Sequence, residues 1–339
     1  MNQTNKIIQG DSLKVLKTFP DESINCVITS PPYWGLRDYG VTGQLGLEKT
    51  PEEYVEKMVE IFQEVKRVLK KDGTLWLNLG DSYASNGREG GDIDKDNGMD
   101  IERGRGRLNK HPTIKPKDIV GIPWRVALAL QANGWYLRQD IIWAKPNPMP
   151  ESVTDRCTKS HEYVFLLTKS AKYYFDNEAI KEVATGYDGG KDTMMKGSKK
   201  YKNGNYLAGG NANSLAIKGR ERWQYKNLQE DGQTPNTMHE KRLVGEEYLS
   251  PVRNKRSVWT VTTKPFREAH FATFPEDLIQ PMVLAGCPKN GIILDPFIGA
   301  GTTAVVALKA DKNFIGIELN PQYIKIAEDR IKPLRNKLF

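Results

Sequence analysis

An apolar, strand-like run that stops at two consecutive prolines limits the folding of this chain more than any other feature. Residues 24–28 (INCVI) are apolar and short enough for a buried parallel strand, and residues 29–35 (TSPPYWG) follow directly. Each proline fixes its own φ and restricts the residue before it, so neither a helix nor a strand can continue through the pair. The sequence therefore predicts a stiff loop at the carboxyl end of a strand, where open α/β sheets bind their ligands.

The composition of this loop suits the recognition of an exocyclic amine on a base. A hydroxyl and several backbone carbonyls can accept hydrogen bonds from such an amine, while an aromatic ring stacks on the base that carries it. Taken alone, the loop is equally compatible with a rigid turn that binds nothing. The interpretation therefore depends on a second motif near the other end of the chain.

The second motif has the form of a nucleoside-cofactor site. Residues 292–294 predict a buried strand, 295–303 (DPFIGAGTT) a glycine-rich turn, 304–310 a helix, and 314–317 a further strand that ends at Glu318. An acidic residue there can accept hydrogen bonds from both hydroxyls of a ribose. The pattern lacks the third glycine of a dinucleotide site, and a carboxylate and a phenylalanine stand where a pyrophosphate would lie. The cationic, amine-bearing end of S-adenosylmethionine fits better, and the alternative is a sharp turn without a ligand.

The rest of the periodic sequence predicts an α/β chain. A helix starting at Pro51 is expected to run to about residue 69, with Gly73 just past its end, and Asp11 or Ser12 is expected to cap a short helix. Further strands are expected at residues 6–9, 74–79, 135–144 and 163–167, and further helices at 13–19, 125–133 and 322–331. Lys145 and Glu162 lie near strand ends, where support of the fold is the simplest role for them.

Two segments lack this periodicity. Residues 82–118 are polar and contain the basic run RGRGR, which predicts a mobile loop or a solvated insertion. Residues 177–262 interleave lysine and arginine with aromatic residues, which suits a nucleic-acid surface, although an accessory insertion is the alternative. The net charge of +8 favours a polyanionic partner. We therefore expect a catalytic part at 1–176, a DNA-binding insertion at 177–262 and a cofactor-binding part at 263–339.

Composition excludes several other classes of protein. The three cysteines are scattered, so neither a disulfide framework nor a zinc site is indicated, and no metal site is expected. No apolar run approaches the roughly 20 residues needed to span a bilayer, and the N-terminus lacks the apolar core of a signal peptide. We therefore expect a cytoplasmic protein without a membrane partner.

Together the motifs resemble the β-class DNA amino-methyltransferases, a family circularly permuted so that the catalytic motif precedes the cofactor motif. The resemblance covers roughly residues 1–80, 119–180 and 250–331. It is carried by TSPPY at 29–33, the turn at 295–303 with GIE at 316–318, HFATFP at 270–275, and GDS at 10–12, which in the family lines the adenine of the cofactor.

The resemblance implies a Rossmann-like, S-adenosylmethionine-dependent methyltransferase fold, with a mostly parallel sheet, helices on both faces and an inserted target-recognition region. It implies catalytic roles for Ser30, Pro31, Pro32 and Tyr33, and cofactor-binding roles for Asp11, Phe274, Asp295, Pro296, Phe297, Gly299, Gly301, Thr302 and Glu318. Candidate DNA contacts are Trp34, Arg37, Lys199, Lys200, Arg220 and Arg222, with packing an equal alternative for the first two.

The implied reaction is methyl transfer to a flipped base of double-stranded DNA, as in restriction-modification systems. In this family Ser-Pro-Pro-Tyr usually accompanies N4 of cytosine and Asp-Pro-Pro-Tyr N6 of adenine, with exceptions, so N6-adenine is the nearest alternative. No cysteine lies in a Pro-Cys loop, as C5-cytosine methylation would require. A DNA-binding protein without turnover is the alternative from another class. We also expect a cognate restriction endonuclease in the same system. The chain itself is expected to be a monomer or a homodimer.

Overall fold

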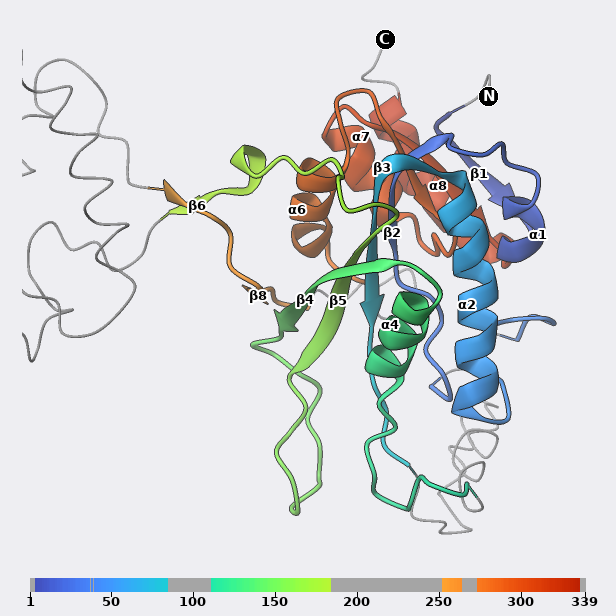
Figure 1. Ribbon diagram of the computed structural model, residues 1–339, viewed down its shortest axis with the longest axis vertical. Helices are drawn as coiled ribbons and strands as arrows, with labels where there is room; N and C mark the ends of the chain where they lie inside the picture. The colour runs from blue at the N-terminus through green and yellow to red at the C-terminus, as the bar shows by residue number, and fades with distance from the viewer. Residues whose placement is uncertain are drawn as a thin grey trace, which may run out of the picture. The chain divides into compact units, whose positions relative to one another are not determined.

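The structure is a computed structural model that describes residues 4–36, 38, 40–84, 111–183, 252–263 and 273–335. Within these residues, eight strands form one sheet in the order β1-β10-β9-β2-β3-β5-β4-β8 (Figure 1). The strands are β1 (Lys6–Gln9), β2 (Ile24–Thr29), β3 (Leu69–Leu79), β4 (Tyr136–Ala144), β5 (His161–Thr168), β8 (Val258–Thr260), β9 (Ile292–Asp295) and β10 (Asn313–Glu318). The helices are α1 (Ser12–Leu16), α2 (Pro51–Val68), α4 (Ile122–Ala132), the short 3₁₀ helix η1 (Glu178–Ile180), α6 (Glu276–Gly286), α7 (Thr302–Lys309) and α8 (Pro321–Arg335).

The sheet is parallel except at β5, which runs antiparallel to both of its neighbours, β3 and β4. The remaining pairs, β1–β10, β10–β9, β9–β2, β2–β3 and β4–β8, are parallel. The carboxyl ends of β1, β2, β9 and β10 therefore meet at one edge of the sheet. This confirms the expected α/β fold with a mostly parallel sheet.

Helices cover both faces of the sheet. Successive side chains of a strand point to opposite faces, so the buried strands present apolar side chains to the helices on each side. In β2, Val27 packs in the same core as residues of α1, α2 and α4, whereas Cys26 and Ile28 pack with α6, α7 and α8. In β3, Leu75 and Leu77 belong to the first core and Trp76 to the second. Figure 1 shows α2 and α4 on one side of the strands and α6 and α7 on the other.

The end of α2 differs from the expectation. The helix ends at Val68, Leu69 is extended, and the chain passes at once into β3. Gly73, expected just past the helix, therefore lies inside the strand. A Cβ at this position would meet Leu69 Cγ at 2.5 Å and Asn25 O at 2.9 Å, so close packing of the backbone, rather than a helix cap, requires the glycine.

Helix α6 was not predicted from the sequence. It begins after Pro275 and contains Pro281, and proline is a signal against helix. The two acidic residues of its first turn, Glu276 and Asp277, are the helix-start signal that the sequence does carry.

Much of the two aperiodic segments lies outside the described residues, at 85–110 and 184–251, and so do Arg37, Lys199, Lys200, Arg220 and Arg222. Of the segment at 177–262, β8 pairs with β4 in the main sheet. Residues 181–254 form a separate compact unit, and its described residues form the antiparallel pair of β6 (Glu182–Val183) and β7 (Val252–Arg253). The assignments of a mobile loop and a DNA-binding insertion stay predictions. No helix among the described residues is both long and apolar enough to cross a membrane.

Candidate active site

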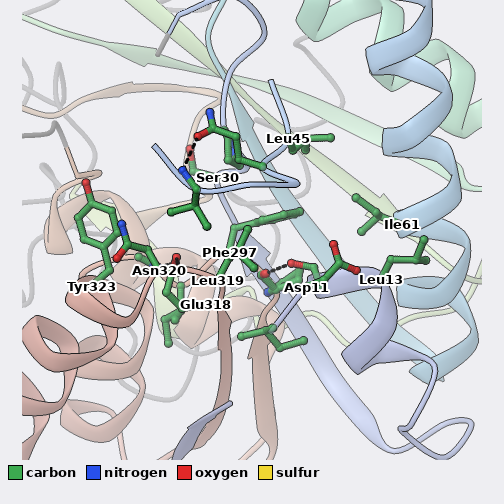
Figure 2. A pocket seen from close by; sticks show the side chains of 18 of the residues that line it. Asp11, Leu13, Ser30, Leu45, Ile61, Phe297, Glu318, Leu319, Asn320 and Tyr323 are labelled. Atoms are coloured by element: carbon green, nitrogen blue, oxygen red, sulfur yellow. Dashed lines mark hydrogen bonds between the residues drawn. The ribbon is translucent and has the colours of Figure 1, made fainter. Parts of the chain in front are cut away.

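Both sequence motifs line one cavity at the carboxyl edge of the sheet. Because β2 lies beside β9, and β1 beside β10, segments from opposite ends of the chain meet there. The cavity has a volume of about 390 Å³, within the range of small-molecule sites. Of the predicted site residues, those that line it are Asp11, Ser30, Pro32, Phe274, Pro296, Phe297, Gly299, Thr302 and Glu318. Figure 2 labels Asp11, Ser30, Phe297 and Glu318 among them.

Glu318 closes β10 and points into this cavity. Its Oε2 accepts from the backbone N–H of Gly299 at 2.9 Å, and its Oε1 accepts from that of Asn320 at 2.8 Å. Burial raises the pKa of this carboxyl, and these backbone hydrogen bonds oppose the rise. Each oxygen keeps lone-pair capacity after its backbone bond, so the group can accept from both ribose hydroxyls of a nucleoside.

The glycine-rich turn needs two positive φ angles, +51° at Gly299 and +83° at Gly301. Gly299 lines the cavity, but Gly301 caps the N-terminus of α7. A Cβ on Gly301 would lie 2.8 Å from Ala327 Cβ of α8, so this glycine permits close packing of the turn against a helix.

Asp295 lies beneath the turn and does not line the cavity. Its Oδ1 accepts from Thr29 Oγ1 at 2.7 Å and from the Phe297 N–H at 3.0 Å, and its Oδ2 accepts from Thr303 Oγ1 at 2.6 Å. Burial raises the pKa of Asp295 to about 6. The carboxylate therefore joins the end of β2 to the glycine-rich turn.

The N-terminal motif, residues 10–12, contacts the glycine-rich turn. Asp11 caps α1 by accepting from the Lys14 N–H at 2.9 Å, and Ser12 Oγ donates to the Pro296 carbonyl at 2.5 Å. Asp11 also lines the cavity, as Figure 2 shows. Its expected position beside an adenine stays a prediction.

The loop at residues 29–35 contributes Ser30 and Pro32 to the cavity wall, while the Tyr33 hydroxyl lies in a polar cluster. Ser30 Oγ donates to Tyr33 Oη at 3.3 Å, and Tyr54 Oη donates to the Pro32 carbonyl at 2.9 Å. Burial, followed by the charge of Glu162, raises the pKa of Tyr33 well above its ordinary value. The phenol therefore stays protonated and can donate a hydrogen bond.

Trp34 is buried, with 4% of its surface exposed, and its indole N–H donates to the Glu48 carbonyl at 3.0 Å. The packing alternative accounts for this contact, and the predicted contact with DNA remains untested.

Several residues of the site were not predicted. The loop after the catalytic motif and helix α2 supply part of the wall, and so does the region after Glu318. These additional lining residues include Val41, Gln44, Leu45, Ile61, Asn320 and Tyr323. The glycines of residues 36–47 are a sequence signal that could have pointed to this loop, because glycine lets a backbone approach a ligand closely. The described residues contain no group of three or more metal-ligating side chains that could hold an ion.

The chain is similar to known proteins over most of its length. The sequence profile of the N6/N4 methyltransferases, described as DNA methylase, matches residues 24–329. The chain is 43% identical over 329 residues to the type II methyltransferase M.Cfr9I of Citrobacter freundii, covering 96% of this chain and 87% of that protein. It is 42% identical to the type II methyltransferase M.SmaI of Serratia marcescens, covering 96% and 90%.

Solved structures share the fold at low sequence identity. The cytosine-N4-specific PvuII DNA methyltransferase matches with a TM-score of 0.57 and 17% identity, covering 99% of this chain and 93% of that one. A putative DNA modification methylase of Thermus thermophilus, complexed with S-adenosylmethionine, matches with a TM-score of 0.55 and 19% identity, covering 97% and 93%.

Proposed function

This chain belongs to the N6/N4 DNA methylase family, and we propose that it uses S-adenosylmethionine to methylate N4 of cytosine at a specific site in duplex DNA. The observation that carries the proposal is the position of Ser30. The serine of TSPPY lines the same cavity as Glu318 and the glycine-rich turn, although the motifs lie near opposite ends of the chain. A base held at Ser30 would therefore lie next to the cofactor site.

The lining of the cavity fits the cofactor. Glu318 offers two acceptor oxygens for a ribose, Phe274 and Phe297 offer aromatic surface, and Gly299 lets the backbone approach the ligand. Asp11 offers a further carboxylate for donor groups. The cofactor supplies a methyl group on a sulfonium, and we assign Asp295 and Gly301 to support of the turn that receives it.

The catalytic loop orients the amine of the target base. We propose that a flipped base stacks on Tyr33 and that its amine donates to Ser30 Oγ and to the Pro31 carbonyl. These bonds direct the nitrogen lone pair toward the methyl group. Transfer would then be a direct displacement, in which the N–CH3 bond forms as the S–CH3 bond breaks, the sulfonium becomes a thioether and the methylated amine releases one proton to water. Catalysis consists of positioning and electrostatics. None of the described residues that line the cavity is a cysteine, which fits a reaction without a covalent enzyme intermediate.

Two alternatives keep parts of this proposal. An N6-adenine methyltransferase would use the same side chains, because adenine also presents an exocyclic amine. A DNA-binding protein without turnover would bind the cofactor in the same cavity but would not transfer its methyl group. We propose that residues 177–262 read the DNA sequence and that the chain acts beside a cognate endonuclease in a restriction-modification system.

Identification of the methylated nucleoside tests the assignment of the base. The purified protein is incubated with unmethylated genomic DNA and S-adenosylmethionine, and the DNA is digested and analysed by mass spectrometry. We expect N4-methylcytosine. N6-methyladenine would overturn the base assignment and keep the fold, and cofactor binding without any modified base would support the DNA-binding alternative.

Replacing Glu318 by alanine is expected to weaken cofactor binding by on the order of 10–100-fold, because hydrogen bonds to a charged group contribute about 1.5–3 kcal/mol. Titration calorimetry with S-adenosylmethionine measures the change. Glu328→Ala is the matched control, since Glu328 pairs with Arg335 on α8 and does not line the cavity. Equal affinity of Glu318→Ala and wild type would remove Glu318 from the ribose site.

A further inference from the structure

A polar cluster behind the catalytic loop holds the hydroxyl of Tyr33. Tyr33 Oη lies 2.8 Å from Glu162 Oε2 and 3.1 Å from Asn78 Oδ1. Asn78 lies near the end of β3 and Glu162 near the start of β5, and the antiparallel register of these strands brings both to the carboxyl edge of the sheet. Neither residue lines the cofactor cavity.

The phenol proton has one preferred acceptor in this cluster. The amide of Asn78 is oriented by its Nδ2, which donates to the Tyr163 carbonyl at 3.0 Å and to Glu162 Oε2 at 3.2 Å. Its Oδ1 therefore faces Tyr33 as an acceptor, but the carboxylate of Glu162 is closer and is the stronger acceptor. Tyr33 thus donates to Glu162.

Glu162 also forms an ion pair with Lys145. The two side chains form an ion pair in which each is only 17% exposed, and the Lys145 ammonium also lies 4.2 Å from the centroid of the Trp143 ring. A nearly buried ion pair adds little stability over well-packed apolar residues, because both charges lose their hydration. A role in keeping a charged acceptor beside Tyr33 accounts for its presence better than a role in stability.

The direction of these hydrogen bonds also determines whether the Ser30 hydroxyl donates or accepts. Since Tyr33 donates its proton to Glu162, its oxygen can only accept from Ser30, and Ser30 Oγ donates to it at 3.3 Å. The Ser30 proton is turned away from the target, which leaves the lone pairs of Oγ for a donor in the cavity. We propose that Glu162 is a positioning residue that acts through Tyr33 to keep Ser30 Oγ an acceptor for the amine of the target base.

This inference rests on the proposed methyl transfer to an exocyclic amine, but it does not depend on which base carries the amine. A cytosine amine and an adenine amine both donate through N–H. The rates of the variants are therefore compared with wild type on whichever base the nucleoside analysis identifies. An error in the base assignment would change the methylated nucleoside that is found. An error in the role of Glu162 would instead appear in the rates of the variants.

Tyr33→Phe and Glu162→Gln, alone and combined, test the inference. Phenylalanine keeps the ring, which packs against the backbone at Gly80, and removes only the hydroxyl. Glutamine can offer Tyr33 an N–H in place of an obligate acceptor, which frees the phenol proton to turn toward Ser30. Each variant is expected to slow single-turnover methyl transfer by on the order of 10–100-fold, the loss that corresponds to one hydrogen bond to a charged group. The double variant should be no slower than Tyr33→Phe, because both changes break the same chain.

Two readouts separate this role from a structural one. The affinity for S-adenosylmethionine should stay within about twofold of wild type, and so should capture of a flipped base, followed by the fluorescence of 2-aminopurine at the mapped target position. Tyr163→Phe is the matched control, since its hydroxyl lies 3.4 Å from His161 Nε2 and outside the chain from Ser30 to Glu162. This control should keep the wild-type rate.

Wild-type turnover in Tyr33→Phe would overturn the proposal, and this variant decides the matter if Glu162→Gln does not fold. Rate losses that multiply in the double variant would also overturn it, since they would mean independent effects. A loss of rate in Glu162→Gln that is matched by a loss of cofactor affinity would show that Glu162 supports the cavity rather than Ser30.

Discussion

Ser30→Ala is expected to lower the single-turnover rate of methyl transfer by about 10²–10³-fold, the loss that follows removal of one preorganised hydrogen-bond partner at a reacting group. Ser30 lines the cavity, and its hydroxyl proton is directed to Tyr33, so we expect its oxygen to accept from the base. Alanine removes this acceptor without adding bulk.

The variant separates chemistry from binding. Affinity for S-adenosylmethionine, measured by calorimetry, should change by less than about threefold, because the cofactor interactions that we propose come from Glu318, the turn and the aromatic side chains. Ser23→Ala is the control, since its hydroxyl bonds the Pro20 carbonyl in a distant turn. Ser30→Ala with the wild-type rate would show that the amine is oriented by backbone carbonyls alone, and the serine would then carry no information about the base.

Much of the fold was predictable because its sequence signals are local. The strands β1, β2, β9 and β10 are short apolar runs bounded by glycine, proline or acidic residues, and each lies within one or two residues of its predicted range. Two motifs that each end a parallel strand must meet at one edge of the sheet. The convergence of Ser30 and Glu318 on one cavity follows from this rule and from the order of the strands.

The residues that could not be predicted depend on pairings distant in sequence. Glu162 reaches Tyr33 only because β5 inserts antiparallel between β3 and β4, and no local pattern specifies this register. The position of Asp295 is a related case. The sequence showed a carboxylate at the turn, but only the packing of Thr29 and Thr303 around it shows that its oxygens face inward.

Asp295→Ala is expected to lower the free energy of unfolding by about 3–5 kcal/mol, the largest effect on stability among these variants. Alanine leaves the hydroxyls of Thr29 and Thr303 and the N–H of Phe297 without their acceptor, in a region that is almost fully buried. Chemical unfolding and the thermal midpoint measure the loss. The affinity for S-adenosylmethionine should fall as well, because the turn loses the group that fixes it to β2.

Asp295→Asn is the matched comparison, and its effect should depend on pH. The side chain keeps its shape and an acceptor oxygen, and the Thr303 hydroxyl can rotate to accept from the new amide, so the loss in this variant should be much smaller than in the alanine variant.

The wild-type carboxyl has a pKa raised from 3.8 to about 6, so between these values the folded state binds more protons than the unfolded state. The free energy of unfolding of wild type therefore falls as the pH rises through this window, by about 3 kcal/mol from this group. Asparagine does not ionise and lacks this contribution.

The stability of Asp295→Asn relative to wild type should consequently increase from about pH 4 to about pH 6 and stay constant above it. A difference that is the same at pH 4.5 and pH 7.5 would show that the carboxylate is stabilised by its three donors as strongly as burial destabilises it. In that case the charge itself would be part of what joins the catalytic strand to the cofactor turn. With the expected slope, only the hydrogen-bonding geometry of Asp295 is needed for that junction.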